Sequence, residues 1–339
     1  MDVHGTDCIY MYIVCVYVFF CFGIFFRMTI SILPRYHSAD LVFPSSVVRI
    51  DLNKKSEVEC LAWSGDVLLI LTRDGVIKSW NKTMGEERTG TPWTWIESNP
   101  IDSNLIAAVS WDGQLKMFGS DFVRETNSLK KEKLLYCAWR MDGQELAVLT
   151  RSDMVGIVDC NDTVVQTIVP GVDVYAVVYD CLGQLWVALG GTPGKVQVYA
   201  QSEGVYSELK SLTSHAHMTT CLDRTSDGKF VISGGSDALV CLWDTASFVC
   251  VKTFAESLSP ITTLSVDWAN QFVAWGSGGS KDGESVLSVA SLVAGAHVLS
   301  HITSGPVTRV RWHPTKPVLA FSTVTESGSN TVVSVVSFP

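Results

Sequence analysis

Three residues in the second half of the chain, His215, Ser233 and Asp237, are the types that form a hydrolase triad. In a triad, a histidine takes the proton of a serine hydroxyl while a carboxylate orients the imidazole ring. Ser233, however, ends a strand-like apolar run and does not sit on the strand-to-helix elbow that exposes a catalytic serine. The order and placement of the three residues therefore argue against nucleophilic catalysis.

The same residues suit a structural role when Trp243 is added to them. Buried polar groups in a sheet need hydrogen-bond partners. A histidine before the first strand, a serine at the end of the second, an aspartate in the tight turn and a tryptophan in the third can supply each other. We predict that His215, Ser233, Asp237 and Trp243 form one buried hydrogen-bonded chain.

No other motif in the sequence is a strong candidate for a catalytic or ligand-binding site. The run Gly190–Lys195 (GGTPGK) is similar to a phosphate-binding loop, but its glycine spacing is one residue short and a strand follows it instead of a helix. The ten cysteines show no metal-ligand spacing, which favours a reduced, intracellular protein without a zinc site. We predict a non-enzymatic protein with no catalytic residues, no metal, no cofactor and no small-molecule substrate.

The net charge of the chain argues against direct binding of nucleic acid. The formal net charge is -9, and nucleic-acid binding by a general field requires basic patches. We therefore expect any RNA contact to be indirect.

The elements that position these residues are short strands. Phe230–Phe254 holds three apolar runs rich in Val, Phe and Trp, separated by turn-forming residues, and Thr219–Leu222 precedes them. Four strands within about 40 residues, the third ending in Trp243-Asp244, are typical of one WD-repeat propeller blade.

The pattern recurs along the chain. The first strands of successive units end near Trp63, Ile96, Trp139, Tyr179, Arg224, Asp267 and Trp312. Most of these intervals match the ~40–45 residues of a propeller blade. We identify four strands in the third, fifth and sixth units and only three in the others. The sequence predicts an all-β, seven-bladed WD-repeat β-propeller over residues 46–339, in which Val47–Leu52 closes the ring by joining the last blade.

The first 45 residues are predicted to lie outside the propeller. Cys8–Phe26 has no charged residue and approaches the ~20 residues that span a bilayer. Residues 1–27 are either a membrane span, with Arg27 and Arg35 keeping the propeller in the cytosol, or translated leader ahead of a start at Met28, which we favour. Residues 28–45 are predicted to be a linker. Contact with a membrane is expected only if residues 1–27 are expressed and inserted.

Turn residues suggest where partners bind. The residue before each turn aspartate tends to point to the rim of one face, and Arg and Trp are common interface anchors. The candidates for a partner-binding rim are Arg73, Trp111, Arg151, Ser152, Ser236 and Lys281. Arg151 lies one position earlier than the others. Trp111 is equally interpreted as a packed strand-end residue, and Arg73 and Arg151 as simple solvated side chains.

Two stretches resemble one family. Gly235–Phe254 (GSDALVCLWDTASFVCVKTF), with Pro260–Ser265 (PITTLS), is similar to the fifth and sixth blades of the THO complex subunit 3 family. Arg311–Thr323 (RWHPTKPVLAFST) is similar to that family's last blade. The likeness is clear over residues 210–325 and faint before residue 130. Ser214-His215 stands where Gly-His is usual, and the hydrophobic N-terminus has no counterpart in the family.

The resemblance implies a scaffold subunit in the nucleus that acts in transcription-coupled mRNP assembly and nuclear mRNA export. It implies docking on a large helical scaffold subunit and other THO-like proteins, and supplies no catalytic residue. The alternatives are a WD-repeat adaptor of another assembly, such as a spliceosomal particle, and a membrane-tethered propeller facing the cytosol.

Overall fold

The computed structural model describes residues 46–52, 57–81, 83–88, 91–102, 104–118, 123–126, 129, 132–160, 163–255, 257, 259–278, 285–303, 305–324 and 331–338. The chain divides into two units, Met1–Asp40 and Leu41–Pro339, and every described residue belongs to the second. The interpretations of residues 1–27 and the linker 28–45 therefore lie outside the described residues. Within the described ranges, no helix is long and apolar enough to cross a membrane.

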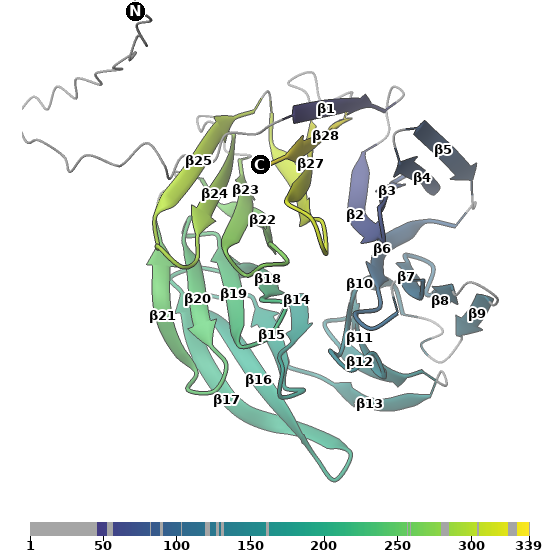
Figure 1. Ribbon diagram of the computed structural model, residues 1–339. Coiled ribbons are helices and arrows are strands. Elements are labelled where there is room, and N and C mark those ends of the chain that lie inside the picture. Colours follow the sequence, from purple (N-terminus) through teal and green to yellow (C-terminus); the bar gives the residue numbers. More distant parts are fainter. Residues whose placement is uncertain are drawn as a thin grey trace, which may run out of the picture. The chain divides into compact units, whose positions relative to one another are not determined.

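The second unit is a ring of seven four-stranded antiparallel sheets (Figure 1). From the inner to the outer strand, the first blade consists of β2 (Val58–Ser64), β3 (Val67–Thr72), β4 (Val76–Asn81) and β5 (Thr83–Arg88), the second of β6 (Trp93–Ser98), β7 (Ile106–Ser110), β8 (Leu115–Phe118) and β9 (Val123–Thr126), and the third of β10 (Leu134–Trp139), β11 (Glu145–Thr150), β12 (Val155–Asp159) and β13 (Val164–Ile168). The fourth blade consists of β14 (Val174–Tyr179), β15 (Leu185–Leu189), β16 (Gly194–Ser202) and β17 (Val205–His215), and the fifth of β18 (Thr219–Arg224), β19 (Phe230–Gly235), β20 (Val240–Asp244) and β21 (Val249–Phe254). The sixth blade consists of β22 (Ile261–Val266), β23 (Phe272–Ser277), β24 (Val286–Ser291) and β25 (His297–Ile302), and the seventh of β26 (Val307–Trp312), β27 (Val318–Val324), β28 (Thr331–Ser337) and β1 (Ser46–Asp51). The predicted seven-bladed propeller is confirmed.

The first and last strands share one sheet. β1 pairs antiparallel with β28, from Ser46 opposite Ser337 to Asp51 opposite Val332. The inner strands contact one another around the ring, and β26 contacts β2. The seventh blade is thus built from both ends of the propeller sequence, so pairing between them fastens the ring.

The core consists of seven apolar clusters, one at each junction between neighbouring blades. Because the second strand of each blade is covered on both faces, it is almost continuously buried, without the alternation of a half-exposed strand. β15 (LWVAL) is buried at all five positions. The fully buried Trp139, Trp186 and Trp275 fill three of these junctions.

A bulge recurs at one position in all seven inner strands. The pairing with the second strand shifts register after the first residue of each, for example between Trp93 and Trp95 and between Val307 and Arg309. The extra residue re-aims the side chains around it, as bulges commonly do beside binding sites. These bulges surround the axis of the ring.

Hydroxyls at the bulges join neighbouring blades. Thr220 Oγ1 is 3.0 Å from the Gly234 oxygen in its own blade and 2.7 Å from the Ile261 oxygen in the next. Thr94 and Thr262 make the same pair of contacts in their blades. The side chain of a single bulge residue thus helps to hold two sheets together.

Two predicted strand starts in the fifth blade were early. The third strand was expected from Ala238 and the fourth from Phe248, but they begin at Val240 and Val249. Ala238 and Phe248 have φ angles of 66° and 58°, in the left-handed region, which is incompatible with a strand. Both residues belong to the turns.

Candidate functional site

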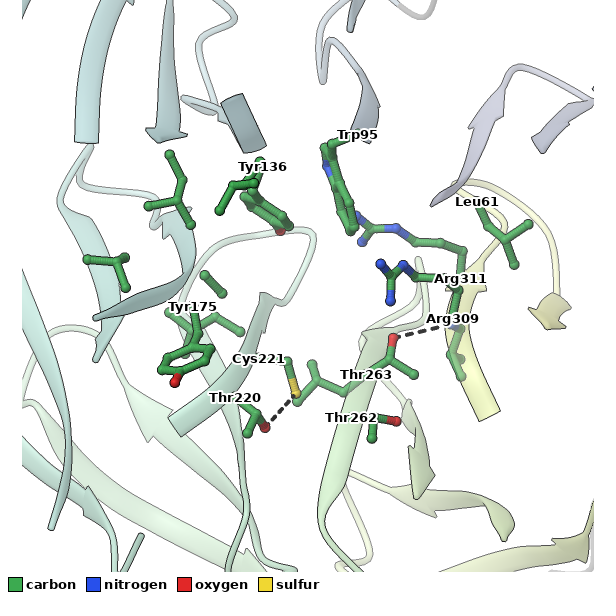
Figure 2. A pocket seen from close by; sticks show the side chains of 17 residues that line it. Leu61, Trp95, Tyr136, Tyr175, Thr220, Cys221, Thr262, Thr263, Arg309 and Arg311 are labelled. Carbon is green, nitrogen blue, oxygen red and sulfur yellow. Dashed lines mark hydrogen bonds between the residues drawn. The ribbon is translucent and has the colours of Figure 1, made fainter. Parts of the chain in front are cut away.

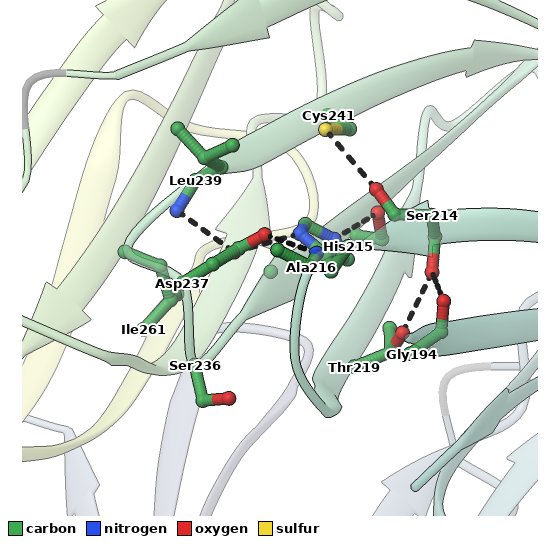
Figure 3. Close-up of polar contacts among 12 residues, drawn as sticks. Gly194, Ser214, His215, Ala216, Thr219, Ser236, Asp237, Leu239, Cys241 and Ile261 are labelled. Atoms are coloured by element: carbon green, nitrogen blue, oxygen red, sulfur yellow. Dashed lines mark hydrogen bonds and ion pairs between the residues drawn. The ribbon is translucent and has the colours of Figure 1, made fainter. Parts of the chain in front are cut away.

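The four residues of the predicted chain come together at the junction of the fourth and fifth blades. His215, at the end of β17, places Nδ1 2.9 Å from Asp237 Oδ1 and Nε2 2.8 Å from Ser233 Oγ. Trp243 Nε1 donates to the same Ser233 oxygen at 3.0 Å. Asp237 also accepts from the Ala216 backbone N–H at 2.8 Å (Figure 3).

The donor and acceptor in each of these hydrogen bonds follow from the two terminal groups, the Asp237 carboxylate and the Trp243 indole. Asp237 is an acceptor, so His215 Nδ1 carries the proton and Nε2 accepts from the Ser233 hydroxyl, whose oxygen accepts from Trp243. Burial lowers the pKa of His215, although the neighbouring Asp237 opposes this, and the ring stays neutral at pH 7. Ser233 has an exposed fraction of 0%. No substrate can reach its hydroxyl, and the geometry favours a structural link between blades.

The turn that contains Asp237 in the fifth blade recurs in three other blades, without a residue equivalent to His215. Thr72 bonds Asp74, Ser110 bonds Asp112, and Thr150 bonds Ser152 at 2.9 Å. The following residues, Gly75, Gly113 and Asp153, all have positive φ. Ser152 therefore occupies the turn-aspartate position, and the prediction that placed it on the rim was one residue out of register.

The corrected register aligns Arg73, Trp111 and Arg151. Their backbone N–H groups donate to Glu57, Pro92 and Lys133, the residues just before an inner strand. We call the end of the ring where the inner strands begin the top. These three turns therefore lie on the top, and so does the turn of Ser236, whose N–H donates to Met218. Lys281 lies outside the described residues.

Trp111 carries two cations. The ring centroid is 4.7 Å from Lys133 Nζ and 5.0 Å from Arg151 Cζ, and the side chain remains 36% exposed. We call Trp111, Lys133 and Arg151 the top cluster. Arg73 lies apart from it and pairs with Glu57 at 2.5 Å and Glu59 at 3.5 Å. Of the predicted rim residues, the structure thus brings Trp111 and Arg151 together but not Arg73.

A cavity of about 310 Å³ lies on the axis, a feature that the sequence did not predict. All seven inner strands contribute to it, mostly through bulge residues and their neighbours (Figure 2). Trp95, Arg309 and Arg311 line one side, with Arg309 and Arg311 Cζ 5.8 and 5.2 Å from the Trp95 ring. Tyr136 packs against Trp95, with the ring centroids 4.2 Å apart and the ring planes tilted by 39°. The two alternating arginines of β26 (VTRVRW) are the feature of the sequence that could have indicated this cavity.

Carboxylates lie beneath the cavity wall. Burial raises the pKa of Glu97 to about 7, and Trp95 Nε1 is 3.4 Å from Glu97 Oε2. Asp223 accepts from the backbone N–H groups of Arg224 and Val266, at 2.8 and 2.9 Å. Its Oδ2 is 4.0 Å from Arg311 Nη1, beyond hydrogen-bond distance. The arginines therefore face the cavity without a close carboxylate partner.

A second hollow of about 360 Å³ lies between the third and fourth blades. Its one arginine, Arg140, is already paired with Asp142 at 2.5 Å and Glu145 at 2.9 Å. Tyr206 donates to the same Glu145 at 2.7 Å. This network joins two blades and pairs the guanidinium of Arg140 with carboxylates. Among the described residues, no group of three His, Cys, Asp or Glu side chains is placed to hold a metal ion.

The ring and the buried chain define a WD-repeat β-propeller with seven blades. The WD domain, G-beta repeat family matches residues 206–244, which contain all four residues of that chain. The protein is 22% identical over 231 residues to THO complex subunit 3 of Arabidopsis thaliana, covering 66% of this chain and 69% of that protein. The predicted resemblance to THO complex subunit 3 is thereby confirmed as a distant similarity.

A second relative is the WD repeat-containing protein AAC3 of Dictyostelium discoideum. It is 25% identical over 234 residues, or 67% of this chain and 47% of AAC3. The chain thus matches about half the length of AAC3. Neither relative is similar enough to transfer a partner.

Proposed function

We propose that this protein is a non-catalytic scaffold of a THO-like complex, acting in the nucleus in mRNP assembly and mRNA export. The observation that carries the proposal is the similarity to Arabidopsis THO complex subunit 3 over two thirds of both chains. A large helical subunit and other THO-like proteins are the proposed partners. The net charge of -9 supports indirect contact with RNA.

The top of the ring is the proposed docking surface. Exposed Trp111, Val172, Tyr175 and Met218 all lie in top turns or at the first residues of inner strands. Large side chains with cations stacked on them are common anchors of protein interfaces. A tryptophan such as Trp111 buries a large apolar area when a partner covers it. The top cluster is therefore expected to contribute much of the binding energy.

Affinity purification of the tagged protein from its own cells, followed by mass spectrometry, tests the assignment. We expect a large helical subunit and other THO-like proteins to co-purify with the wild-type chain. If a different set of proteins co-purifies stoichiometrically, the THO assignment is wrong and the chain is an adaptor of another assembly.

A pair of tryptophan variants tests the surface. Trp111→Ala should reduce recovery of the partner at least tenfold, because interface anchors of this kind are worth about 2 kcal/mol or more. Trp268→Ala is the matched control, since Trp268 is 44% exposed in the turn between β22 and β23 at the bottom of the ring. Equal recovery with both variants would exclude the top cluster as the docking surface.

A further inference from the structure

The axial cavity has two chemically distinct sides. Trp95, Arg309 and Arg311 form a cationic side, and both arginine side chains extend from β26 toward the tryptophan (Figure 2). Tyr175, with aliphatic residues of the third and fourth blades, forms the other side, and Tyr136, whose ring packs against Trp95, adjoins both. A ligand that fills the cavity therefore meets charge on one side and apolar surface on the other.

The two guanidinium groups have donors to spare. Arg309 uses Nε and Nη1 for the backbone oxygens of Glu59 and Thr308, and its Nη2 is 4.0 Å from Glu59 Oε2. Arg311 has only the 4.0 Å approach of Asp223. Both guanidinium groups lie over the Trp95 ring, with Cζ 5.8 and 5.2 Å from its centroid, and this contact limits their movement. Such pre-organised donors bind a planar oxyanion with little loss of side-chain entropy.

The cavity wall itself supplies no anion. Its described lining includes Arg309 and Arg311 but no aspartate or glutamate. The carboxylates beneath it are occupied: Asp223 accepts two backbone N–H groups, and Glu97 contacts the Trp95 indole. The nearest carboxylate oxygens, of Glu59 and Asp223, lie 4.0 Å from the guanidinium nitrogens of Arg309 and Arg311. A negatively charged ligand that makes closer, hydrogen-bonded contact would therefore stabilise the arginines as well as itself.

We propose that the axial cavity binds a peptide segment of a partner protein by taking up one aspartate or glutamate side chain, with an adjacent apolar side chain against Tyr136 and Tyr175. The carboxylate lies against the open edges of Arg309 and Arg311. The site is independent of the THO assignment, because it rests on the cavity alone. It lies near the top of the ring, within reach of a chain docked on the top cluster.

The apolar side of the cavity favours a peptide carboxylate over a free inorganic anion. Tyr175 and the aliphatic lining residues have no role in binding a small anion. An acidic residue beside an apolar one uses both sides.

Selection from a random twelve-residue peptide library displayed on phage tests this proposal on the full chain. Wild-type protein should enrich peptides that share an aspartate or glutamate next to an aliphatic or aromatic residue. Arg311→Gln should lose this enrichment, whereas Arg73→Gln should keep it. Arg73 is a cation on the same end of the ring, paired with Glu57 outside the cavity. Thermal unfolding of both variants confirms that they are folded.

Synthetic versions of the best enriched peptide test the chemistry on wild-type protein alone, so the result does not depend on a variant's folding. Replacing its acidic residue by the isosteric amide should weaken binding at least tenfold, as expected for the loss of a charge-assisted hydrogen bond. Failure to enrich an acidic residue, equal binding of acid and amide, or unchanged selection with Arg311→Gln would overturn the proposal. A phosphoserine version that binds more than tenfold tighter than the carboxylate would also overturn it.

Discussion

Replacing Ser233 by alanine tests the buried chain at its centre. Ser233 Oγ is bonded to two side chains, Trp243 Nε1 at 3.0 Å and His215 Nε2 at 2.8 Å. Both are at least nine-tenths buried, so neither can turn to water in the folded state. Each buried group left without a partner costs about 1–3 kcal/mol. We therefore expect Ser233→Ala to lower the free energy of unfolding by about 2–5 kcal/mol.

Urea denaturation followed by circular dichroism measures this loss. With a dependence of about 3 kcal/mol per M urea, the midpoint should fall by about 1 M. Ser277→Ala is the control, because Ser277 is also buried but makes one long bond, 3.3 Å to the Val286 oxygen. Its expected loss is about 1 kcal/mol or less. If Ser233→Ala costs no more than Ser277→Ala, the hydrogen bonds drawn here do not stabilise the ring.

A double-mutant cycle then isolates the Trp243 bond. Trp243→Phe removes the indole N–H donor and keeps most of the aromatic ring. In the Trp243→Phe protein, Ser233→Ala therefore leaves only His215 Nε2 without its partner, whereas in the wild-type protein it leaves both His215 Nε2 and Trp243 Nε1 unpaired. The two substitutions together should cost about 1–2 kcal/mol less than the sum of the single costs. Strict additivity would show that Trp243 stabilises the junction by packing alone.

Two further predictions concern the axis of the ring. Burial raises the pKa of Glu97 from 4.5 to about 7, so the stability that its protonation supplies is complete below pH 4.5 and is lost as the pH rises through 7. Glu97→Gln should therefore stabilise the protein by about 1–3 kcal/mol at pH 8 and hardly at all at pH 4.5 in urea denaturation, whereas an equal effect at both pH values would contradict the shift. Thr262→Val removes the hydroxyl that lies 3.1 Å from the Gly276 oxygen and 2.8 Å from the Val307 oxygen. It should lower the unfolding free energy by about 1 kcal/mol, measured in the same way, and no loss would show that this contact does not join the blades.

The second strand of each blade could be predicted most clearly because it is apolar by necessity. It lies between two neighbouring sheets, so runs such as Leu185–Leu189 are hydrophobic throughout. The outer strands β5, β9 and β17 were missed, since an outer strand has solvent along one edge and needs few apolar residues. β5 (TMGEER) contains only one large apolar side chain, and β17 is exposed at seven of its eleven positions.

The candidate sites, like the strands, divide into those that could be predicted from the sequence and those that could not. His215, Ser233, Asp237 and Trp243 could be grouped because they lie within 30 residues and occupy fixed places in one repeat. The top cluster was found in part, because Trp111 and Arg151 follow a recognisable turn. Lys133 was missed, since it precedes the inner strand of the third blade and meets Trp111 of the second blade only across the junction between the two sheets. The axial cavity was missed because its residues are spread from Leu61 to Arg311.

The same geometry explains how a repeated fold makes an asymmetric site. Every blade presents its bulge region to the axis from an equivalent backbone position, so the chemistry of the cavity depends on side-chain identity alone. Arg311 of the seventh blade stacks on Trp95 of the second, although the first blade separates them. The first blade contributes only Leu61 to the cavity lining, a short apolar side chain that leaves room for the guanidinium to cross. A long side chain at position 61 would take this space, and the arginines would lose the aromatic surface that orients them.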